Sequence, residues 1–402
     1  MRFAFVSLIF SLATVQAFAA PGDKYDKDSE WSERPAIKRQ ARSNDVPTAP
    51  KGFAVAKIGS NLGEVVALTT IDSDLFVADT TQDRVIRLKS RQKNSVFETR
   101  AEFLVGFNNI HDLATDETYL YMSDNDGIWE IPASNSLIAD KAPKLVYQNP
   151  SRNLGSKISL ASLPGDQKLI VGNGKCVFSL NAITGETRNY ACGDWQVEDV
   201  AVSPAGGIWA SVIENNSTFI MPIRQSMDDV VKMKLPPNAK STDIQFWNSD
   251  KFPETWPDEW VSDLLFSMSG NHPMIGRAHF SFGDIKADFT GFVDGFSNPS
   301  RFVGGREYWG QPTAIAILDN GETIFAVGET GSLWVMKKDN KPLKIDRVIS
   351  KKPETVINEP ETEKKKTPLS LPRGSSIQSA SSLETDELLK KREIVKQDTI
   401  EE

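Results

Sequence analysis

Histidine and cysteine are scarce in this chain: its 402 residues include three histidines and two cysteines. Scattered along the sequence, they do not form the ligand spacing of a zinc site, so no metal centre is expected. Positive charge is not in excess either, because 46 lysines and arginines stand against 54 aspartates and glutamates, for a net charge of −8. A nucleic-acid-binding protein needs a basic patch, so nucleic acid is not an expected partner.

Long apolar runs are missing after residue 20, so the sequence predicts no membrane-spanning helix. The one apolar run, residues 3–15, follows Arg2 and precedes the small residues Ala17 and Ala19. This order is typical of a secretory signal peptide, and we expect cleavage near Ala19 and a secreted or periplasmic protein. An uncleaved anchor is the less favoured alternative, because the run is shorter than the about 20 residues that span a bilayer. Residues 20–51 are polar and charged, and we expect a disordered lead-in.

The sequence does contain a repeated pattern of short apolar runs between turns. It is clearest at residues 64–88, where runs at 65–69, 75–79 and 85–88 are separated by Asp, Ser and Thr. Similar units begin near residues 65, 110, 158, 197, 242 and 313, at intervals of about 40–50 residues except the last. Such a period, with several strands in each repeat, indicates a β-propeller.

The segments between repeats supply a fourth, outer strand for most units, at residues 102–105, 144–147, 187–191, 230–235 and 288–293. The sixth repeat has no such segment, because the composition turns polar after Met336. Residues 53–58 form a strand without a repeat of its own, and we predict that it closes the ring beside residues 332–336. The predicted fold is all-β: one six-bladed propeller of four-stranded antiparallel blades over residues 52–338, expected to be a monomer.

The two cysteines, Cys176 and Cys192, fall in the third and fourth predicted strands of one repeat. An even number of cysteines in an exported protein favours a disulfide. If the two strands are neighbours, the Cα atoms come within the about 7 Å that a disulfide requires. We therefore predict a bridge, with two buried free thiols as the alternative.

Residues 339–402 are rich in Lys, Glu, Pro, Ser and Thr, and we expect a disordered tail. Within it, residues 385–397 have helical apolar spacing, carboxylates early and lysines late, which predicts a short helix. Such a helix could dock onto a partner, but a solvated tail is the favoured interpretation, because an isolated helix of this length is marginal.

Residues 52–337 resemble the soluble quinoprotein glucose/sorbosone dehydrogenases, a family of six-bladed propellers. The resemblance is carried by short motifs at residues 52–53, 75–79, 119–121, 127–130, 191–201, 252–253, 263–266 and 310–317. It implies the propeller fold and, for an intact site, sugar oxidation with pyrroloquinoline quinone (PQQ) and calcium.

The motif that carries this chemistry is degenerate here. The family's catalytic histidine, near the start of the third blade, has no counterpart in residues 153–160, where Lys157 is the nearest candidate. The cations that hold the quinone are replaced by Trp195, Gln196, Gln311 and the uncharged residues 269–271. Because PQQ carries three carboxylates, each lost cation leaves one of them less compensated.

The candidate site residues are polar and aromatic groups near the starts of the first strands, which line one rim of a propeller's channel. The candidates for a catalytic base are His111 and Lys157, although a hydrogen-bonded core position is the favoured interpretation of His111. The expected ligand-binding rim consists of Asp112, Trp195, Gln196, Glu198, Asp199, Asp243, Trp247, Trp309 and Gln311. The alternative is that these residues only fill the channel.

Two functions follow from this pattern. The favoured one is a secreted, non-catalytic propeller that needs no cofactor and binds a protein or a small molecule such as a sugar. The other is a PQQ- and calcium-dependent sugar dehydrogenase with a rearranged active site.

Overall fold

The computed structural model describes residues 47–92, 94–116, 118–150, 157–163, 167–227, 230–247, 257, 260–279, 289–296 and 310–338. The predicted signal peptide, most of the predicted lead-in, the charged tail with its helix at 385–397, and Trp309 lie outside these residues. None of the described residues forms a helix long and apolar enough to cross a membrane.

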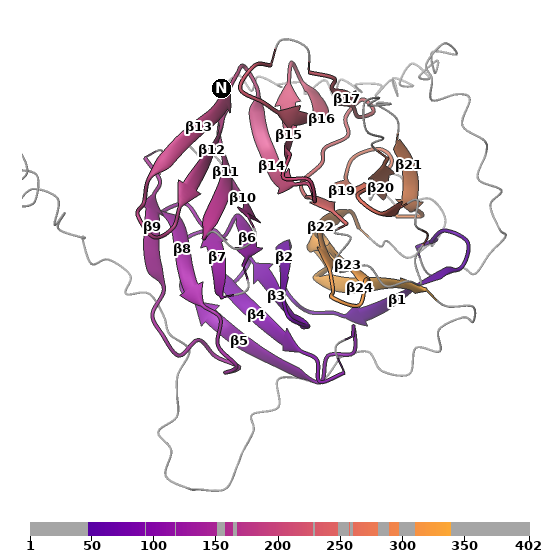
Figure 1. Ribbon diagram of the computed structural model, residues 1–402. Coiled ribbons are helices and arrows are strands. Elements are labelled where there is room, and N and C mark those ends of the chain that lie inside the picture. Colours follow the sequence, from indigo (N-terminus) through magenta and orange to yellow (C-terminus); the bar gives the residue numbers. More distant parts are fainter. Residues whose placement is uncertain are drawn as a thin grey trace, which may run out of the picture. The chain divides into compact units, whose positions relative to one another are not determined.

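The described strands form six antiparallel sheets of four strands, arranged as blades around a central channel (Figure 1). Blades 1 and 2 consist of β2 (Val65–Ile71), β3 (Asp74–Asp79), β4 (Arg84–Lys89), β5 (Thr99–Val105), β6 (Asp112–Thr115), β7 (Tyr119–Ser123), β8 (Gly127–Pro132) and β9 (Lys144–Gln148). Blades 3 and 4 consist of β10 (Ile158–Leu163), β11 (Lys168–Asn173), β12 (Cys176–Asn181), β13 (Thr187–Cys192), β14 (Gln196–Val202), β15 (Ile208–Glu214), β16 (Ser217–Ile223) and β17 (Met233–Lys234). Blades 5 and 6 consist of β18 (Ile244–Phe246), β19 (Leu264–Met268), β20 (Met274–Ala278), β21 (Phe289–Val293), β22 (Pro312–Ile317), β23 (Thr323–Val327), β24 (Ser332–Lys338) and β1 (Phe53–Gly59), with the 3-10 helix η4 (Gly328–Thr330) between β23 and β24.

The innermost strands β2, β6, β10, β14, β18 and β22 enclose the channel, and we call them and the channel the hub. Each contacts the innermost strand of the blade before it and of the blade after it, and β22 contacts β2. The ring is therefore closed with six blades, which confirms the fold predicted from the repeats.

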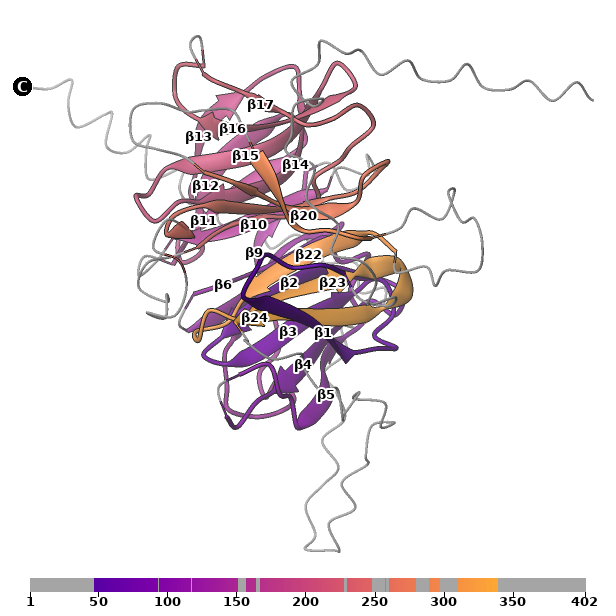
Figure 2. The same cartoon turned by 90° about the vertical axis from the view of Figure 1, so that its right-hand side faces the viewer.

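The closing strand was also predicted correctly. Strand β1 pairs antiparallel with β24, with Phe53 opposite Lys338 and Val55 opposite Met336 (Figure 2). Blade 6 thus combines the first described strand of the chain with the last. Before β1, Thr48 of the predicted lead-in makes an antiparallel bridge to Asp294 beyond β21.

One outer strand is shorter than predicted. Residues 230–235 were expected to form the fourth strand of blade 4, but β17 covers only Met233–Lys234. The strand ends because Pro236 and Pro237 follow Leu235 and lack the N–H group that a ladder needs.

Side chains packed between neighbouring blades form the core. Between blades 1 and 2, the buried Arg87 Nη2 lies 2.5 Å from Asp74 Oδ2, and its Nη1 donates 2.5 Å hydrogen bonds to the carbonyls of Ser134 and Ser136. The same guanidinium lies over the rings of Phe76 and Phe103. A charge buried here is tolerated because carboxylate, carbonyls and ring faces surround it.

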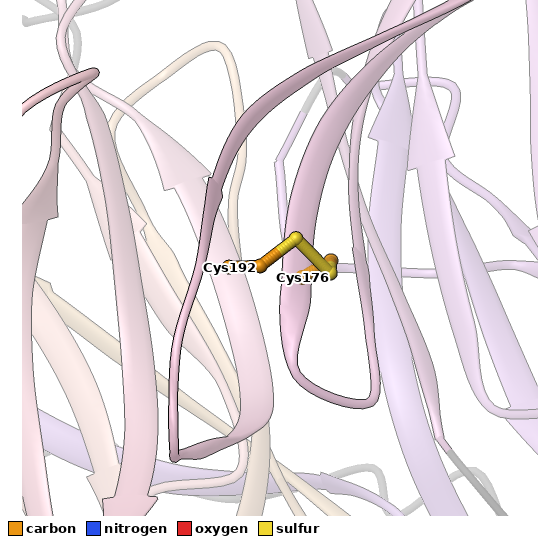
Figure 3. The surroundings of a disulfide bond; sticks show 2 residues. All are labelled: Cys176 and Cys192. Carbon is orange, nitrogen blue, oxygen red and sulfur yellow. A yellow bond between two sulfur atoms is a disulfide. The ribbon is translucent and has the colours of Figure 1, made fainter.

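The predicted disulfide is present in blade 3 (Figure 3). Cys176 and Cys192 are directly opposite each other in β12 and β13, with Cα atoms 4.1 Å apart. The bridge ties the outer edge of the blade at the end where β14, the next innermost strand, begins.

Replacing both cysteines with alanine should lower the free energy of unfolding by about 3 kcal/mol, because the bridge closes a loop with a sequence separation of 16. Chemical denaturation of the variant and the wild type measures this difference. Wild type in reductant should match the variant, and Thr187→Ala in the same outer strand is the matched control. Equal midpoints for variant and oxidised wild type would contradict the prediction.

Candidate functional site

Three aspartates face the hub, one each from β6, β14 and at the start of β18. Each accepts a backbone N–H of the first strand in the following blade: Asp112 Oδ2 from Leu160 at 2.7 Å, Asp199 Oδ2 from Ile244 at 2.7 Å, and Asp243 Oδ2 from Ile315 at 2.6 Å. An innermost strand has no neighbouring strand on its channel side, so its inward N–H groups need such acceptors. These carboxyl groups therefore link blade 2 to 3, 4 to 5 and 5 to 6.

One further contact crosses the channel between blades that are not neighbours. The ammonium of Lys157, just before β10, donates a 3.0 Å hydrogen bond to the carbonyl of Thr242, which connects blades 3 and 5. The candidate base Lys157 is thus held in the hub by a backbone acceptor.

Burial makes the carboxyl groups of the hub weak acids. It raises the pKa of Asp112 to about 6, while Lys157 and the backbone donors oppose the shift. Burial and the charge of Asp112 together raise the pKa of Asp243 to about 8. Burial, with Asp112 and Asp243 nearby, raises the pKa of Asp199 well above its usual range. Lys157 is one ammonium beside the three carboxyl groups of Asp112, Asp199 and Asp243, so some of these carboxyl groups keep their protons near neutral pH.

His111 is 8% exposed, and a backbone hydrogen bond to its Nδ1 holds the ring in the hub. Its Nδ1 accepts the backbone N–H of Ile158 at 3.1 Å, and its Nε2 lies 3.3 Å from Asn109 Nδ2. Burial lowers the pKa of His111 to about 4, Lys157 adds to the shift, and Asn125 opposes it. Because Nδ1 accepts the Ile158 N–H, the neutral ring carries its proton on Nε2, and the Asn109 amide has to turn its oxygen toward Nε2 to accept that proton. Neither ring nitrogen then has a free lone pair to accept another proton.

The other polar residues of the predicted rim lie at the same end of the hub. Gln196 Nε2 donates to the carbonyl of Val197 at 3.3 Å, and Gln311 Oε1 accepts the N–H of Gly270 at 2.9 Å. Glu198 is half-buried; burial raises its pKa, and Lys157 and Lys240 oppose the shift. These side chains are brought together as predicted, but the two glutamines already bond to backbone groups.

The predicted rim aromatics do not form an exposed platform. Trp247 is fully buried and stacks on Trp260, with ring centroids 5.8 Å apart. Trp195 is 7% exposed and packs against the core between blades 3 and 4. Gly193 lies against its ring, where an added Cβ would come within 2.3 Å of the indole. Trp309 lies outside the described residues.

The channel contains a cavity of about 190 Å³. The three aspartates line it together with small and polar side chains that include Thr69, Thr115, Ser162 and Gln245. Three of these also link blades: Thr69 Oγ1 lies 3.2 Å from Thr115 Oγ1, and Ser162 Oγ donates to the carbonyl of Thr115. Pockets for drug-sized ligands measure about 300–1,000 Å³, so this cavity suits only a smaller occupant.

Two polar clusters were not predicted from the sequence. Near His111, asparagine side chains from blades 1 to 3 form a chain of hydrogen bonds, which we call the amide cluster: Asn173 to Asn149 Oδ1 at 3.5 Å, Asn149 to the carbonyl of Asn125 at 3.2 Å, and Asn125 to Asn108 Oδ1 at 3.4 Å. Nothing in the spacing of these residues identifies the cluster, because the turns that carry them meet only in the folded ring.

The second cluster lies in blade 5. His279, 57% exposed, has its Nδ1 2.6 Å from Oδ1 of the buried Asp263, and Arg277 Nε lies 3.5 Å from the other oxygen. His279 was not among the predicted site residues. The alternation of side chains along a strand could have identified the Asp263–His279 pair. Positions 277 and 279 lie on one face at the end of β20, and Asp263 directly precedes β19, the strand that pairs with β20.

The described residues of the hub do not fit PQQ. A quinone with three carboxylates needs cations, whereas the described groups around the channel are Asp112, Asp199, Asp243 and Glu198 against Lys157, with Lys240 at the rim beside Glu198. In the described part of the chain, no three His, Cys, Asp or Glu side chains are placed to hold one metal ion.

No protein-family model and no curated protein sequence matches the chain. Solved structures share its fold. The PQQ domain of pyranose dehydrogenase from Coprinopsis cinerea is 10% identical, with a TM-score of 0.56 over 74% of this chain and 98% of that chain. A PQQ-bound aldose sugar dehydrogenase from Streptomyces coelicolor is 12% identical, with a TM-score of 0.50 over 72% and 99%. A gluconolactonase from Xanthomonas campestris is 11% identical, with a TM-score of 0.51 over 74% and 96%.

At these identities the likeness concerns the fold. The resemblance to quinoprotein sugar dehydrogenases is thereby confirmed as a shared six-bladed architecture, and one such architecture serves several chemistries.

The stability of the protein should fall between pH 6.5 and 8.5. The Asp243 carboxyl has a pKa of about 8 in the folded chain and about 3.9 when unfolded. In this window the folded chain holds a proton that the unfolded chain has released, so the free energy of unfolding decreases as pH rises. The pKa of His111 is lowered to about 4 in the folded chain. This residue makes the free energy of unfolding increase with pH, but only below about pH 6.5, where the unfolded histidine is protonated.

Melting temperatures across this window test the expectation. Asp243→Asn should flatten the decline, because the amide oxygen still accepts the Ile315 N–H and carries no charge. A wild-type melting temperature that stays constant, or an equal decline in the variant, would show that the carboxyl does not titrate as stated.

Proposed function

We propose that the chain is a non-catalytic binding propeller, exported from the cytoplasm, which has the fold of sugar dehydrogenases without their chemistry. One observation carries this proposal: among the described residues of the hub, the carboxyl groups of Asp112, Asp199 and Asp243 and the ammonium of Lys157 already bond to backbone groups of other blades. A catalytic group has to be available to substrate, whereas these groups hold the ring together.

The contacts of the two predicted candidates for a base support the same proposal. Hydride removal from a sugar requires a group that takes the hydroxyl proton. His111 has its Nδ1 lone pair engaged by the Ile158 N–H, and Lys157 is an ammonium donating to Thr242. Neither side chain is arranged to accept a proton.

The amide cluster supports a neutral, hydroxyl-rich ligand such as a sugar. Asn108 and Asn109 are exposed, and Asn125 and Asn173 are half-buried beside them. A primary amide offers two donors and an acceptor with two lone pairs, so it suits hydroxyl groups and discriminates little by charge. The cluster lies at the channel end where innermost strands begin, beside His111.

Export is supported by two features. The disulfide between Cys176 and Cys192 persists in oxidising compartments such as the periplasm or the extracellular space. The apolar run and small-residue site at residues 3–19 have the order of a signal peptide.

Reconstitution tests the non-catalytic assignment. Purified protein is incubated with PQQ and calcium, and bound-quinone absorption, thermal shift and dye reduction with aldoses are recorded. We expect none of these signals, because the acidic hub repels the quinone carboxylates. The PQQ domain of the Coprinopsis cinerea pyranose dehydrogenase serves as positive control. Bound quinone together with sugar-dependent dye reduction would overturn the proposal in favour of a dehydrogenase.

A glycan-binding screen followed by calorimetry tests the ligand class. For a sugar that binds, Asn108→Ala and Asn173→Ala should each weaken affinity about fivefold, because a neutral hydrogen bond contributes about 1 kcal/mol. Asn135→Ala, an exposed asparagine after β8, is the matched control and should change nothing. Binding that is insensitive to the first two variants would place the sugar elsewhere.

A further inference from the structure

A cleft of about 410 Å³ lies between blades 6 and 1, at the end of the ring where the innermost strands begin. Small-molecule sites measure about 300–1,000 Å³, so this volume is in their range. Three segments line the cleft: Gly63 and Glu64 before β2, Thr81 in the turn between β3 and β4, and residues 329–331 in the turn between β23 and β24. The function proposed above makes no use of it.

Hydrogen bonds and close backbone contacts fix the shape of the cleft. The N–H of Leu62 donates to the carbonyl of Gly331 at 3.1 Å, which joins the two blades. The N–H of Glu64 donates to Thr81 Oγ1 at 3.0 Å. A Cβ added to Gly331, where φ is 55°, would lie 2.5 Å from the carbonyl oxygen of Gly63, so only glycine allows this approach. The walls are therefore in place before a ligand binds, which lowers the cost of binding.

The lining of the cleft is polar and acidic. It carries the carboxylates of Glu64 and Glu329 and the hydroxyl groups of Thr81 and Thr330, and none of the described lining residues is basic, aromatic or apolar apart from the two glycines. Glu64 is exposed, and within the described part of the chain its carboxylate has no ion pair. Carboxylates attract a cation and accept hydroxyl protons, so this lining favours a cationic, hydroxylated ligand and disfavours phosphates.

The described arginines closest along the chain and in blade 1 do not neutralise this lining, because they are engaged elsewhere. Arg84 Nε lies 2.8 Å from Asp79 Oδ2, beneath Gly63. Arg100 Nη2 donates to the carbonyl of Asn61 at 3.0 Å. The positive charge that Glu64 lacks can therefore come from a ligand.

We infer that this cleft binds an amino sugar, which combines ring hydroxyl groups with a protonated primary amine. The ammonium pairs with Glu64, and Glu329 of the other blade adds a second negative charge. Ring hydroxyls exchange hydrogen bonds with the threonines and the glycine backbone. An aliphatic polyamine fits less well, since its methylene groups would lie against polar groups. The inference goes beyond the proposed function and does not depend on the amide cluster.

The ligand can be a free amino sugar or the end of a longer glycan. Thr81 belongs to the same turn as Asp83, whose Oδ1 accepts the N–H of Asn109 at 2.9 Å. The cleft and the amide cluster thus lie on two sides of one turn, and a glycan that starts in the cleft can continue over the turn toward the asparagines.

Ligand-observed NMR titrations of the full-length protein test the inference with D-glucosamine, N-acetylglucosamine and glucose at pH 6.5, where the amine of glucosamine is protonated. Glucosamine should bind about fivefold more tightly than either neutral sugar, because it alone pairs with an exposed carboxylate. This preference should shrink in 0.5 M salt. Equal affinity for the three sugars, or no binding of glucosamine, would overturn the inference.

Glu64→Gln keeps the size of the side chain and removes its charge. It should weaken glucosamine binding about fivefold and leave glucose binding unchanged. Glu186→Gln, in the exposed turn between β12 and β13 at the other end of the ring, removes the same charge and should have no effect. If Glu64→Gln does not fold, Glu329→Gln makes the corresponding change in blade 6. A folded variant of either kind that keeps the full preference for the amine would refute the assignment.

Two further measurements separate the sources of the ligand and the two sites. A chitosan tetramer that binds more tightly than glucosamine, and loses affinity in Glu64→Gln, supports a glycan end as the ligand, whereas equal affinities support a free amino sugar. Asn108→Ala should leave glucosamine binding unchanged, because Asn108 does not line the cleft. A loss of glucosamine binding in Asn108→Ala would place the amine in the amide cluster and overturn the inference.

Discussion

The hydrogen bond from an inward-facing backbone N–H to an aspartate of the preceding blade governs the rest of this structure. In a propeller the innermost strands have neighbours on one side only, and their channel-side N–H groups would otherwise be left without an acceptor in a narrow, partly dry space. Asp112, Asp199 and Asp243 supply that acceptor and fix the register of one blade against the next. These three carboxyl groups are therefore engaged in bonds that join one blade to the next.

The use of aspartates as acceptors places several carboxyl groups close together in a confined volume. Desolvation disfavours their charged forms, and the single positive charge of Lys157 opposes this effect at each aspartate without cancelling it, so these carboxyl groups remain partly protonated. An acidic, proton-retaining channel is poorly suited to an anionic quinone and to hydride chemistry that needs a free base.

The sequence predicted the architecture well and the site only in part. Strand runs, Asp and Gly turns and the repeat length are local signals, and they placed six blades, the closing strand β1 and the Cys176–Cys192 bridge correctly. The polar hub residues were predicted because they start first strands. The orientation of Trp195 and Trp247 was not, since apolar side chains at strand ends face either the rim or the gap between blades, and packing decides. The Asp263–His279 pair and the amide cluster depend on which turns meet across strands and blades, which spacing along the chain does not encode.

The pairing of β1 with β24 has a consequence for biogenesis. The outer edge of blade 6 is supplied by β1, which leaves the ribosome before every other described strand of the ring, and its partner β24 emerges only after every other blade has been made. During that interval the N-terminal strand has no sheet to join and the sixth blade has a bare edge, which is a template for unwanted association. Translocation of the whole chain before folding would bring both ends into one compartment at one time, so the ring can close on itself instead of on a neighbouring molecule.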